Sequence, residues 1–96
     1  MSLWLKEVLA SFDRSIVEIL FGEHATKDKD LTLVDVDYLV LTIRVGKVDE
    51  EKSTEEKRRI CFKNYFAEVG MTYFVIVELY PSFIKVVTVI KKKGKY

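Results

Sequence analysis

Residues 72–91, TYFVIVELYPSFIKVVTVIK, carry the strongest structural signal in the sequence. Two runs rich in Val, Ile, Phe and Tyr, Thr72–Tyr80 and Phe83–Lys91, flank the pair Pro81-Ser82. β-Branched and aromatic residues favour strands, and two such runs joined by a short turn predict an antiparallel β-hairpin. Residues 86–90 are apolar on both faces, which predicts a central strand that is covered on both sides.

Charge is distributed unevenly along the chain. The formal net charge is only +1, yet residues 1–56 carry seven Lys or Arg against thirteen Asp or Glu, and residues 57–96 carry nine against two. A basic segment of this kind attracts anionic partners, so the partner surface is predicted in the C-terminal half. The alternative interpretation is that 91–96, KKKGKY, is a solvated tail that keeps the last strand soluble.

Length and composition predict a single cytoplasmic domain over 1–96. Hydrophobic residues make up 49% of the 96 residues, a content typical of a globular domain. The longest apolar runs are much shorter than the roughly 18 residues of a membrane span, and the N-terminus does not resemble a signal peptide. The one cysteine fits a reducing compartment, and 32% charged residues with one Asn and no Gln resemble the composition of thermophile proteins.

The N-terminal part of the chain predicts a helix over 3–21. Ser2 is a suitable N-cap, and Gly22 stands where a helix would end. A polar loop is expected to follow over 22–30. The apolar residues that follow helical spacing are Leu5, Val8, Leu9, Phe12, Ile16, Ile19 and Leu20.

Three later segments are harder to assign. Segment 31–46, LTLVDVDYLVLTIRVG, has strand propensity, yet Thr32 is a good N-cap for a helix. Segment 58–66 alternates like a strand, yet Ser53 and Glu56 form a capping box for a helix. Both readings of both segments stay open, and the charged residues of 47–57 predict a loop or an exposed helical turn.

No motif in the sequence names a reaction. The four glycines are too far apart for a phosphate-binding loop, and one histidine with one cysteine cannot build a metal site alone, so no metal and no cofactor are predicted. Cys61 is expected to be a buried structural thiol. His24 is the only side chain whose ordinary pKa lies near neutrality, so it is either a candidate acid or base or an ordinary loop residue.

Basic and aromatic residues are interspersed through the C-terminal half. Lysine and arginine neutralise phosphates, and aromatic rings stack on unpaired bases, so this pattern is typical of nucleic-acid binding. The aromatic residues would equally serve as core, with the cations only bordering it. The predicted nucleic-acid-binding residues are Arg58, Arg59, Lys63, Lys85, Lys91 and Lys92.

About two-thirds of the chain, residues 31–93, resembles a known family. Segment 59–66, RICFKNYF, and segment 73–93, with Val87-Thr88-Val89 near its end, resemble the last strands of small prokaryotic domains related to the RelE/ParE toxins. Segment 31–48 resembles the second helix of the same domains, which runs into a Gly-Lys-Val turn.

The resemblance implies an α+β fold in which two N-terminal helices pack on an antiparallel sheet of three or more strands. It makes 32–45 the second helix and 58–66 a strand. The alternative fold is helix-strand-helix-hairpin, with 31–45 as a strand and 54–69 as a helix.

The resemblance also implies an activity on RNA. Such sites cleave RNA without a metal, by positioning the 2′-hydroxyl and stabilising the charge of the phosphorane. The matching positions are Arg59, Thr88 and Lys91, with His24 as the candidate base. The chain is therefore predicted to be a toxin-type endoribonuclease or an inactive member that only binds RNA, with RNA, the ribosome or an antitoxin as partner.

A non-enzymatic protein-interaction or structural module is the alternative function. The hairpin would then pair with a partner strand or with a second copy in a homodimer. The basic tail would contact an acidic protein, and no membrane is involved in either reading.

Overall fold

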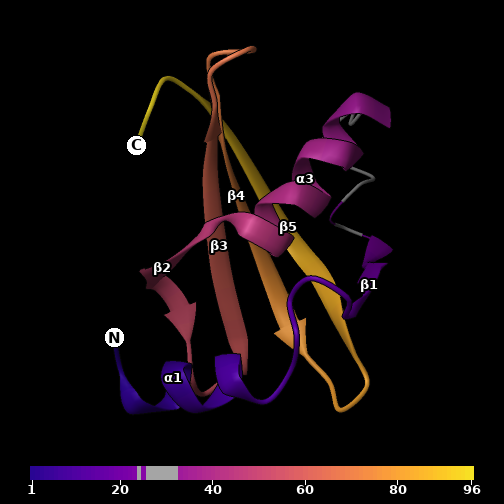
Figure 1. Ribbon diagram of the computed structural model, residues 1–96, viewed down its shortest axis with the longest axis vertical. Helices are drawn as coiled ribbons and strands as arrows, with labels where there is room; N and C mark the ends of the chain where they lie inside the picture. Colours follow the sequence, from indigo (N-terminus) through magenta and orange to yellow (C-terminus); the bar gives the residue numbers. More distant parts are fainter. Residues whose placement is uncertain (24, 26–32) are drawn as a thin grey trace.

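The computed structural model describes residues 1–23, residue 25 and residues 33–96, and it shows an α+β fold (Figure 1). The predicted α+β class is therefore confirmed. The described elements are, in chain order, α1 (Leu3–Ala10), β1 (Glu18–Phe21), α3 (Leu33–Val45), β2 (Lys47–Thr54), β3 (Arg59–Phe66), β4 (Met71–Leu79) and β5 (Phe83–Lys93).

The strands form one mixed sheet in the order β1-β5-β4-β3-β2. Strands β2 to β5 run antiparallel to their neighbours, whereas β1 is parallel to β5, with Glu18 opposite Phe83 and Phe21 opposite Val86. β5, which is close to the C-terminus, therefore lies between β4 and β1, the strand from the N-terminal part of the chain.

The predicted hairpin is confirmed as β4 and β5. Tyr73 lies opposite Lys91, and at the turn the amide of Tyr80 donates to the carbonyl of Phe83 at 3.0 Å. The central position predicted for 86–90 is also confirmed, because β5 has a hydrogen-bonded neighbour on each side. The expected cover on both faces is wrong for the described helices, which pack on one side of the sheet.

The expected pair of N-terminal helices on an antiparallel sheet is wrong. The helix predicted over 3–21 ends at Ala10, residues 18–21 form β1, and this strand separates α1 from α3. Because β1 is parallel to β5, the sheet is mixed rather than antiparallel. Only α3 makes extensive contacts with the sheet, and α1 lies at its lower end in Figure 1.

Local hydrogen bonds explain why the first helix stops. The amide and the hydroxyl of Ser11 both donate to the carbonyl of Val8, at 3.0 and 2.6 Å. The carboxylate of Asp13 accepts from the amide and the hydroxyl of Ser15, at 2.9 and 2.6 Å. Such short-range side-chain bonds compete with helical bonds, and the β-branched pair Ile16-Val17 that follows suits the approach to a strand.

The alternative fold is wrong as well. Leu33–Val45 is a helix rather than a strand, and Arg59–Phe66 is a strand rather than part of a helix, as the resemblance implied. Tertiary packing selects both states: Leu39 and Ile43 of α3 are fully buried, and β3 pairs with a neighbour along each edge. Thr32, the expected N-cap, lies outside the described residues.

The loop or helical turn expected over 47–57 is also wrong for most of its length. Lys47–Thr54 is strand β2, which pairs with β3 and has an irregular register between Asp49 and Thr54. It lies at the end of the sheet, where charged side chains are common because they reach solvent and discourage further pairing.

Two arginines fasten the end of α3 to the segment before β1. The guanidinium of Arg14 donates to the carbonyls of Ile43 and Gly46, at 2.9 and 2.6 Å, and lies 4.3 Å from the ring centre of Phe62. Arg44 donates in return to the carbonyl of Arg14 at 2.9 Å. At Gly46 a Cβ would lie 2.4 Å from the carbonyl oxygen of Thr42, so only glycine allows this close turn into β2.

The hydrophobic core lies on the side of the sheet that faces α3. α3 packs on β3 and β4, and Tyr38 of this helix contacts the rings of Phe66 and Tyr73. The buried cluster includes Leu5, Leu39, Ile43, Ile60, Phe62, Phe66, Tyr73, Val75, Val77, Leu79, Ile84, Val86 and Val89. None of the helices in the described part of the chain is long and apolar enough to cross a membrane.

Candidate functional site

The opposite face of the sheet is here called the open face, because both described helices pack on the core side. Side chains alternate between the two faces of a strand, so the register assigns each residue to a face. Cys61, Ile76 and Thr88 lie side by side across β3, β4 and β5 on the open face. The other open-face positions are Lys47, Asp49, Arg59, Lys63, Tyr65, Thr72, Phe74, Glu78, Lys85, Ile90 and Lys92.

The centre of the open face is covered by lysine side chains. Phe74 is only 3% exposed, although it lies outside the main hydrophobic cluster. The ammonium groups of Lys52 and Lys92 lie 5.0 and 5.6 Å from its ring centre, and the ring of Tyr96 lies 6.3 Å away. Lysine stems shield apolar surface while their charged ends stay in water, and each ammonium is attracted to the aromatic ring.

At one end of the open face, Glu78 neutralises two cations. Its carboxylate lies 3.2 Å from Arg59 and 4.0 Å from Lys85, and it accepts a hydrogen bond from the hydroxyl of Tyr80. The Tyr80 hydrogen bond, together with Arg59 and Lys85, lowers the pKa of Glu78. The ring of Tyr80 stacks on that of Phe83, with 4.7 Å between the ring centres.

At the other end, the residues after β5 fold back and form a small cleft, here called the three-lysine cleft. Its volume is about 250 Å³, and its lining residues are Lys47, Lys63, Asn64, Tyr65, Thr72, Lys95 and Tyr96. The fold-back is held by two hydrogen bonds, from the Gly94 amide to the Gly70 carbonyl at 2.8 Å and from the Thr72 hydroxyl to the Gly94 carbonyl at 2.6 Å. None of the described residues that line the cleft is acidic.

The open face therefore has a surplus of positive charge. Its carboxylates, Asp49 and Glu78, pair with Lys52, Arg59 and Lys85. Within the described part of the chain, no carboxylate pairs with the remaining cations, which are Lys47, Lys63, Lys92 and Lys95.

The structure does not bring the predicted catalytic residues together. Arg59 and Thr88 lie on the open face, whereas Lys91 lies opposite Tyr73 on the core side. His24 lies outside the described residues. A catalytic role for these residues therefore stays a prediction from the resemblance.

The predicted nucleic-acid-binding residues are better grouped. Arg59, Lys63, Lys85 and Lys92 share the open face. Arg58 instead lies in the turn between β2 and β3, where its φ of 53° marks a left-handed conformation.

Lys91 belongs to a polar cluster under the N-terminal turn of α3. Its ammonium lies 3.1 Å from the Asp35 carboxylate, which also accepts a hydrogen bond from the Tyr73 hydroxyl at 2.5 Å. Burial, followed by the contact with Asp35, raises the pKa of Tyr73 well above its ordinary value. These contacts join α3 to β4 and β5, so they explain the cluster as structural.

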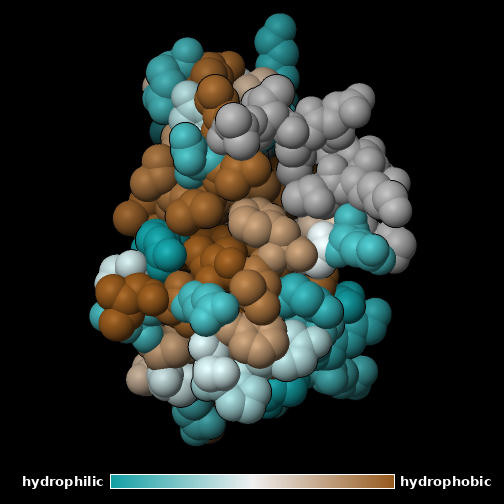
Figure 2. Space-filling view, turned by 90° about the vertical axis from the view of Figure 1, so that its right-hand side faces the viewer, coloured by the Kyte–Doolittle hydropathy of each residue, from teal (hydrophilic) through white to brown (hydrophobic). Residues whose placement is uncertain are grey.

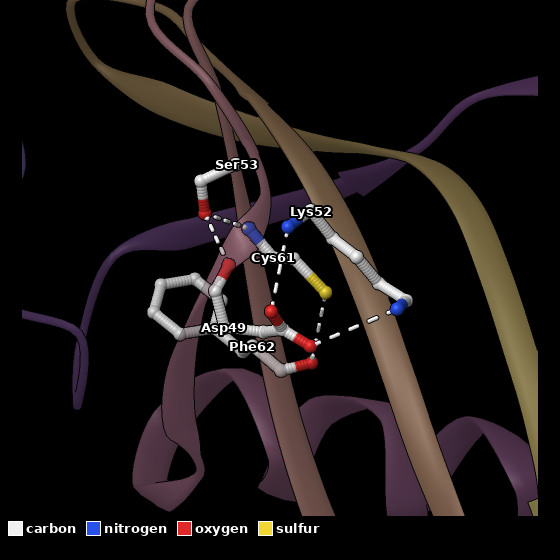
Figure 3. Close-up of polar contacts among 5 residues, drawn as sticks. All are labelled: Asp49, Lys52, Ser53, Cys61 and Phe62. Atoms are coloured by element: carbon white, nitrogen blue, oxygen red, sulfur yellow. Dashed lines mark hydrogen bonds and ion pairs between the residues drawn. The ribbon is translucent and has the colours of Figure 1, made fainter.

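Cys61 is the buried structural thiol that the sequence predicted. It is fully buried, and burial together with the nearby Asp49 carboxylate raises its pKa from 9.0 to about 12. Figure 3 shows its surroundings: Ser53 accepts a hydrogen bond from the Cys61 amide at 3.0 Å and donates to the Asp49 carbonyl at 2.8 Å. Because the thiolate is the reactive form, this thiol is not a nucleophile at neutral pH.

Sequence reasoning missed four residues of the open face. Lys47 and Lys52 were assigned to a loop, although the alternation of Val48 with charged neighbours is compatible with an edge strand. Lys95 and Tyr96 were assigned to a solvated tail. The signal that would have found them is Gly94, which permits the φ of 99° that turns the chain back.

Comparisons with known proteins add no assignment. No protein-family model matches the chain, and neither the curated proteins nor the solved structures compared with it contain a match. Among the described residues, no group of three or more His, Cys, Asp or Glu side chains is arranged to hold a metal ion.

Proposed function

We propose that the open face binds single-stranded RNA. The observation that carries this proposal is a set of cations, Lys47, Lys63, Lys92 and Lys95, that have no carboxylate partner among the described residues. These cations lie next to aromatic rings on a sheet face that neither α1 nor α3 covers. Cations neutralise backbone phosphates, and aromatic side chains offer stacking surfaces to unpaired bases. An exposed strand face with both groups suits an extended polyanion better than a compact ligand.

The aromatic groups at the two ends of the open face differ in availability. Tyr80 and Tyr96 are 37% and 60% exposed, so their rings are accessible to a base. Phe74 is covered by Lys52 and Lys92, so a base reaches it only when these side chains move. The proposal therefore places base stacking at the ends of the open face and phosphate contacts along its length.

RNA binding and RNA cleavage are separate properties, and the purified protein can be tested for both. Toxin-type endoribonuclease activity rests on the resemblance to the RelE/ParE-like group. Incubating total RNA with the protein, with and without ribosomes, and resolving the products on a gel would detect endonucleolytic cleavage.

Fluorescence anisotropy with a labelled single-stranded oligoribonucleotide tests the binding. We expect log Kd to change with log salt with a slope of about 3, from about 0.7 for each of roughly four phosphates. The double substitution Lys63→Glu and Lys92→Glu is expected to weaken binding about tenfold or more. The matched control, Lys6→Glu with Lys57→Glu, changes the net charge equally but lies off the open face, and equal weakening by both pairs would reject the proposal.

A second candidate is self-association through β1, and one observation favours it. β1 is an edge strand, and Leu20 and Phe21 on it are 41% and 36% exposed. Figure 2 shows hydrophobic side chains gathered over the side of the molecule formed by β1 and α3. On α3, Leu41 and Val45 are exposed. A second copy of the chain offers the same apolar patch, which is what a twofold interface requires.

Light scattering after size-exclusion chromatography tests this second candidate. A dimer is expected at high protein concentration, and Leu41→Lys is expected to shift it to monomer. Val69→Lys is the matched control, because Val69 is similarly exposed but lies in the turn between β3 and β4. A monomer at every concentration would reject self-association without affecting the RNA proposal.

A further inference from the structure

The three-lysine cleft contains an arrangement that is unfavourable without a ligand. Lys47 and Lys63 lie directly opposite each other on neighbouring antiparallel strands, with both side chains on the open face. Like charges at such positions repel, since the Cβ atoms are only about 4.5–5.5 Å apart. Lys95 adds a third ammonium from the folded-back residues, and no carboxylate is found among the described residues of the lining.

Specific contacts hold the third lysine at the cleft. Gly94 has a φ of 99°, a conformation that residues other than glycine rarely adopt. Its amide donates to the Gly70 carbonyl in the turn before β4, and its carbonyl accepts from the Thr72 hydroxyl of β4. Lys95 lies 5.9 Å from the ring centre of Tyr65, and Lys92 lies 5.2 Å from that of Tyr96. The chain therefore adds a cation to a pair that already repels.

The size and the lining of the cleft limit what it can hold. Its volume of about 250 Å³ is below the roughly 300–1,000 Å³ of pockets that enclose a whole small molecule. Tyr65 and Tyr96 add aromatic rings. This combination suits one phosphate group with part of the sugar or base next to it.

We infer that the three-lysine cleft is a phosphate-binding subsite that takes one phosphate of a nucleotide chain. The inference rests on the proposed RNA-binding function, and it names the point of the open face where a phosphate is held most tightly. An anion between Lys47, Lys63 and Lys95 removes their mutual repulsion, so the site gains free energy from the ligand that the free protein lacks. A terminal phosphate carries about −1.5 to −2 charges at pH 7, against −1 for an internal one, so the terminal group is expected to bind more tightly.

The test uses one oligoribonucleotide of eight residues in three forms: without a terminal phosphate, with a 5′-phosphate and with a 3′-phosphate. Inorganic phosphate and adenosine are the small probes. Lys47→Met with Lys63→Met removes both charges but keeps the stems, and Lys85→Met with Lys92→Met is the matched control on the same face. Binding is measured by anisotropy, and the cleft is observed through the NMR amide signals of Lys63, Tyr65, Thr72 and Lys95.

The expected results separate the two proposals. At least one phosphorylated form should bind about threefold or more tighter than the unphosphorylated one, and the Lys47/Lys63 variant should lose this preference while the control keeps it. Inorganic phosphate, but not adenosine, should shift the cleft signals. Phosphate should also raise the melting temperature of the native protein more than that of the Lys47/Lys63 variant. Phosphate stabilises proteins in general, and comparing the two proteins removes this general effect.

Two results would overturn the inference. In the first, the Lys47/Lys63 variant binds RNA as tightly as the native protein, whereas the Lys85/Lys92 control does not. The open face would then bind RNA without the cleft. The other is an absence of shifts at the cleft signals with phosphate and with all three oligomers. If phosphate shifts the cleft signals but no oligomer binds, the RNA-binding proposal fails and the phosphate site stands.

Discussion

Lys91 and Lys92 are neighbours on β5, yet they occupy two different environments. Lys91 lies on the core side, where Asp35 and Tyr73 hold its position. Lys92 lies on the open face, where its ammonium lies 5.6 Å from the ring centre of Phe74 and 5.2 Å from that of Tyr96. One sheet thus uses the same residue type for structure on one face and leaves it available for ligands on the other.

The two faces also bury their aromatic residues differently. Phe62 lies within the cluster made by α3 and the sheet, whereas Phe74 lies under the side chains of Lys52, Lys92 and Tyr96. A helix is a rigid cover, and lysine side chains are flexible ones. Stability should therefore depend mainly on the core side, and binding mainly on the open face.

The largest expected effect comes from truncating these two phenylalanines. Phe62→Ala should lower the free energy of unfolding by about 3–5 kcal/mol, because a cavity remains in a closely packed core. Phe74→Ala should cost less, about 1.5–3 kcal/mol, because the flexible lysines can close over the gap and mainly the burial term is lost. Urea unfolding followed by circular dichroism measures both, and equal losses would contradict the distinction between rigid and flexible cover.

The second prediction concerns alkaline pH and Cys61. Its pKa in the folded protein is raised to about 12 from 9.0, so the unfolded chain ionises first as the pH rises. The stabilisation is complete below about pH 9 and is lost as the pH rises toward 12, by at most about 1.4 kcal/mol per pH unit. Urea unfolding between pH 8 and about pH 11 should therefore show a steeper decline for the native protein than for Cys61→Ala, and parallel curves would show that the thiol is accessible to water.

The third prediction compares the neighbouring lysines directly. Lys91→Met should lower the free energy of unfolding by about 1 kcal/mol, a modest amount because its side chain is 41% exposed, and should leave RNA affinity nearly unchanged. Lys92→Met should leave stability within about 0.5 kcal/mol and lower the salt slope of RNA binding by about 0.7. The opposite assignment of the two effects would mean that the core side is the binding face.

The smallest effect is expected from Glu78→Gln. This change releases Arg59 and Lys85 from the carboxylate and removes a negative charge from the open face. RNA affinity should rise about two- to threefold at low salt, and the gain should shrink as salt increases. Anisotropy titrations at two salt concentrations measure it, with Glu7→Gln on α1 as the control, and a loss of affinity would indicate that Glu78 positions its arginine for binding.

The sequence predicted those parts of the fold that depend on neighbouring residues. Strong β-propensity on both sides of Pro81-Ser82 was sufficient for the hairpin. Strict alternation along β5 would place Lys85 and Lys92 on opposite faces, because they are seven residues apart, and the register shift in the β4–β5 pairing puts both on the open face. Strand β1 was missed because its apolar spacing also fits a helix. Its state is selected by β5, which is far away in the sequence.

The missed part of the candidate site has a similar cause. Lys47 faces Lys63 only because β2 is a strand, and the charged residues of β2 carry little strand propensity of their own. Lys95 reaches the cleft only because Gly94 turns the chain. Both positions follow from contacts between elements, and local pattern does not encode such contacts.

The place of β5 inside the sheet has a consequence for synthesis. A ribosome completes residues 18–21 long before it reaches residues 83–93, so these residues of the nascent chain lack the strand with which they later pair. Pairing over such a long stretch of chain is slow to form. The first strand to be synthesised can therefore join the sheet only after the last strand is complete.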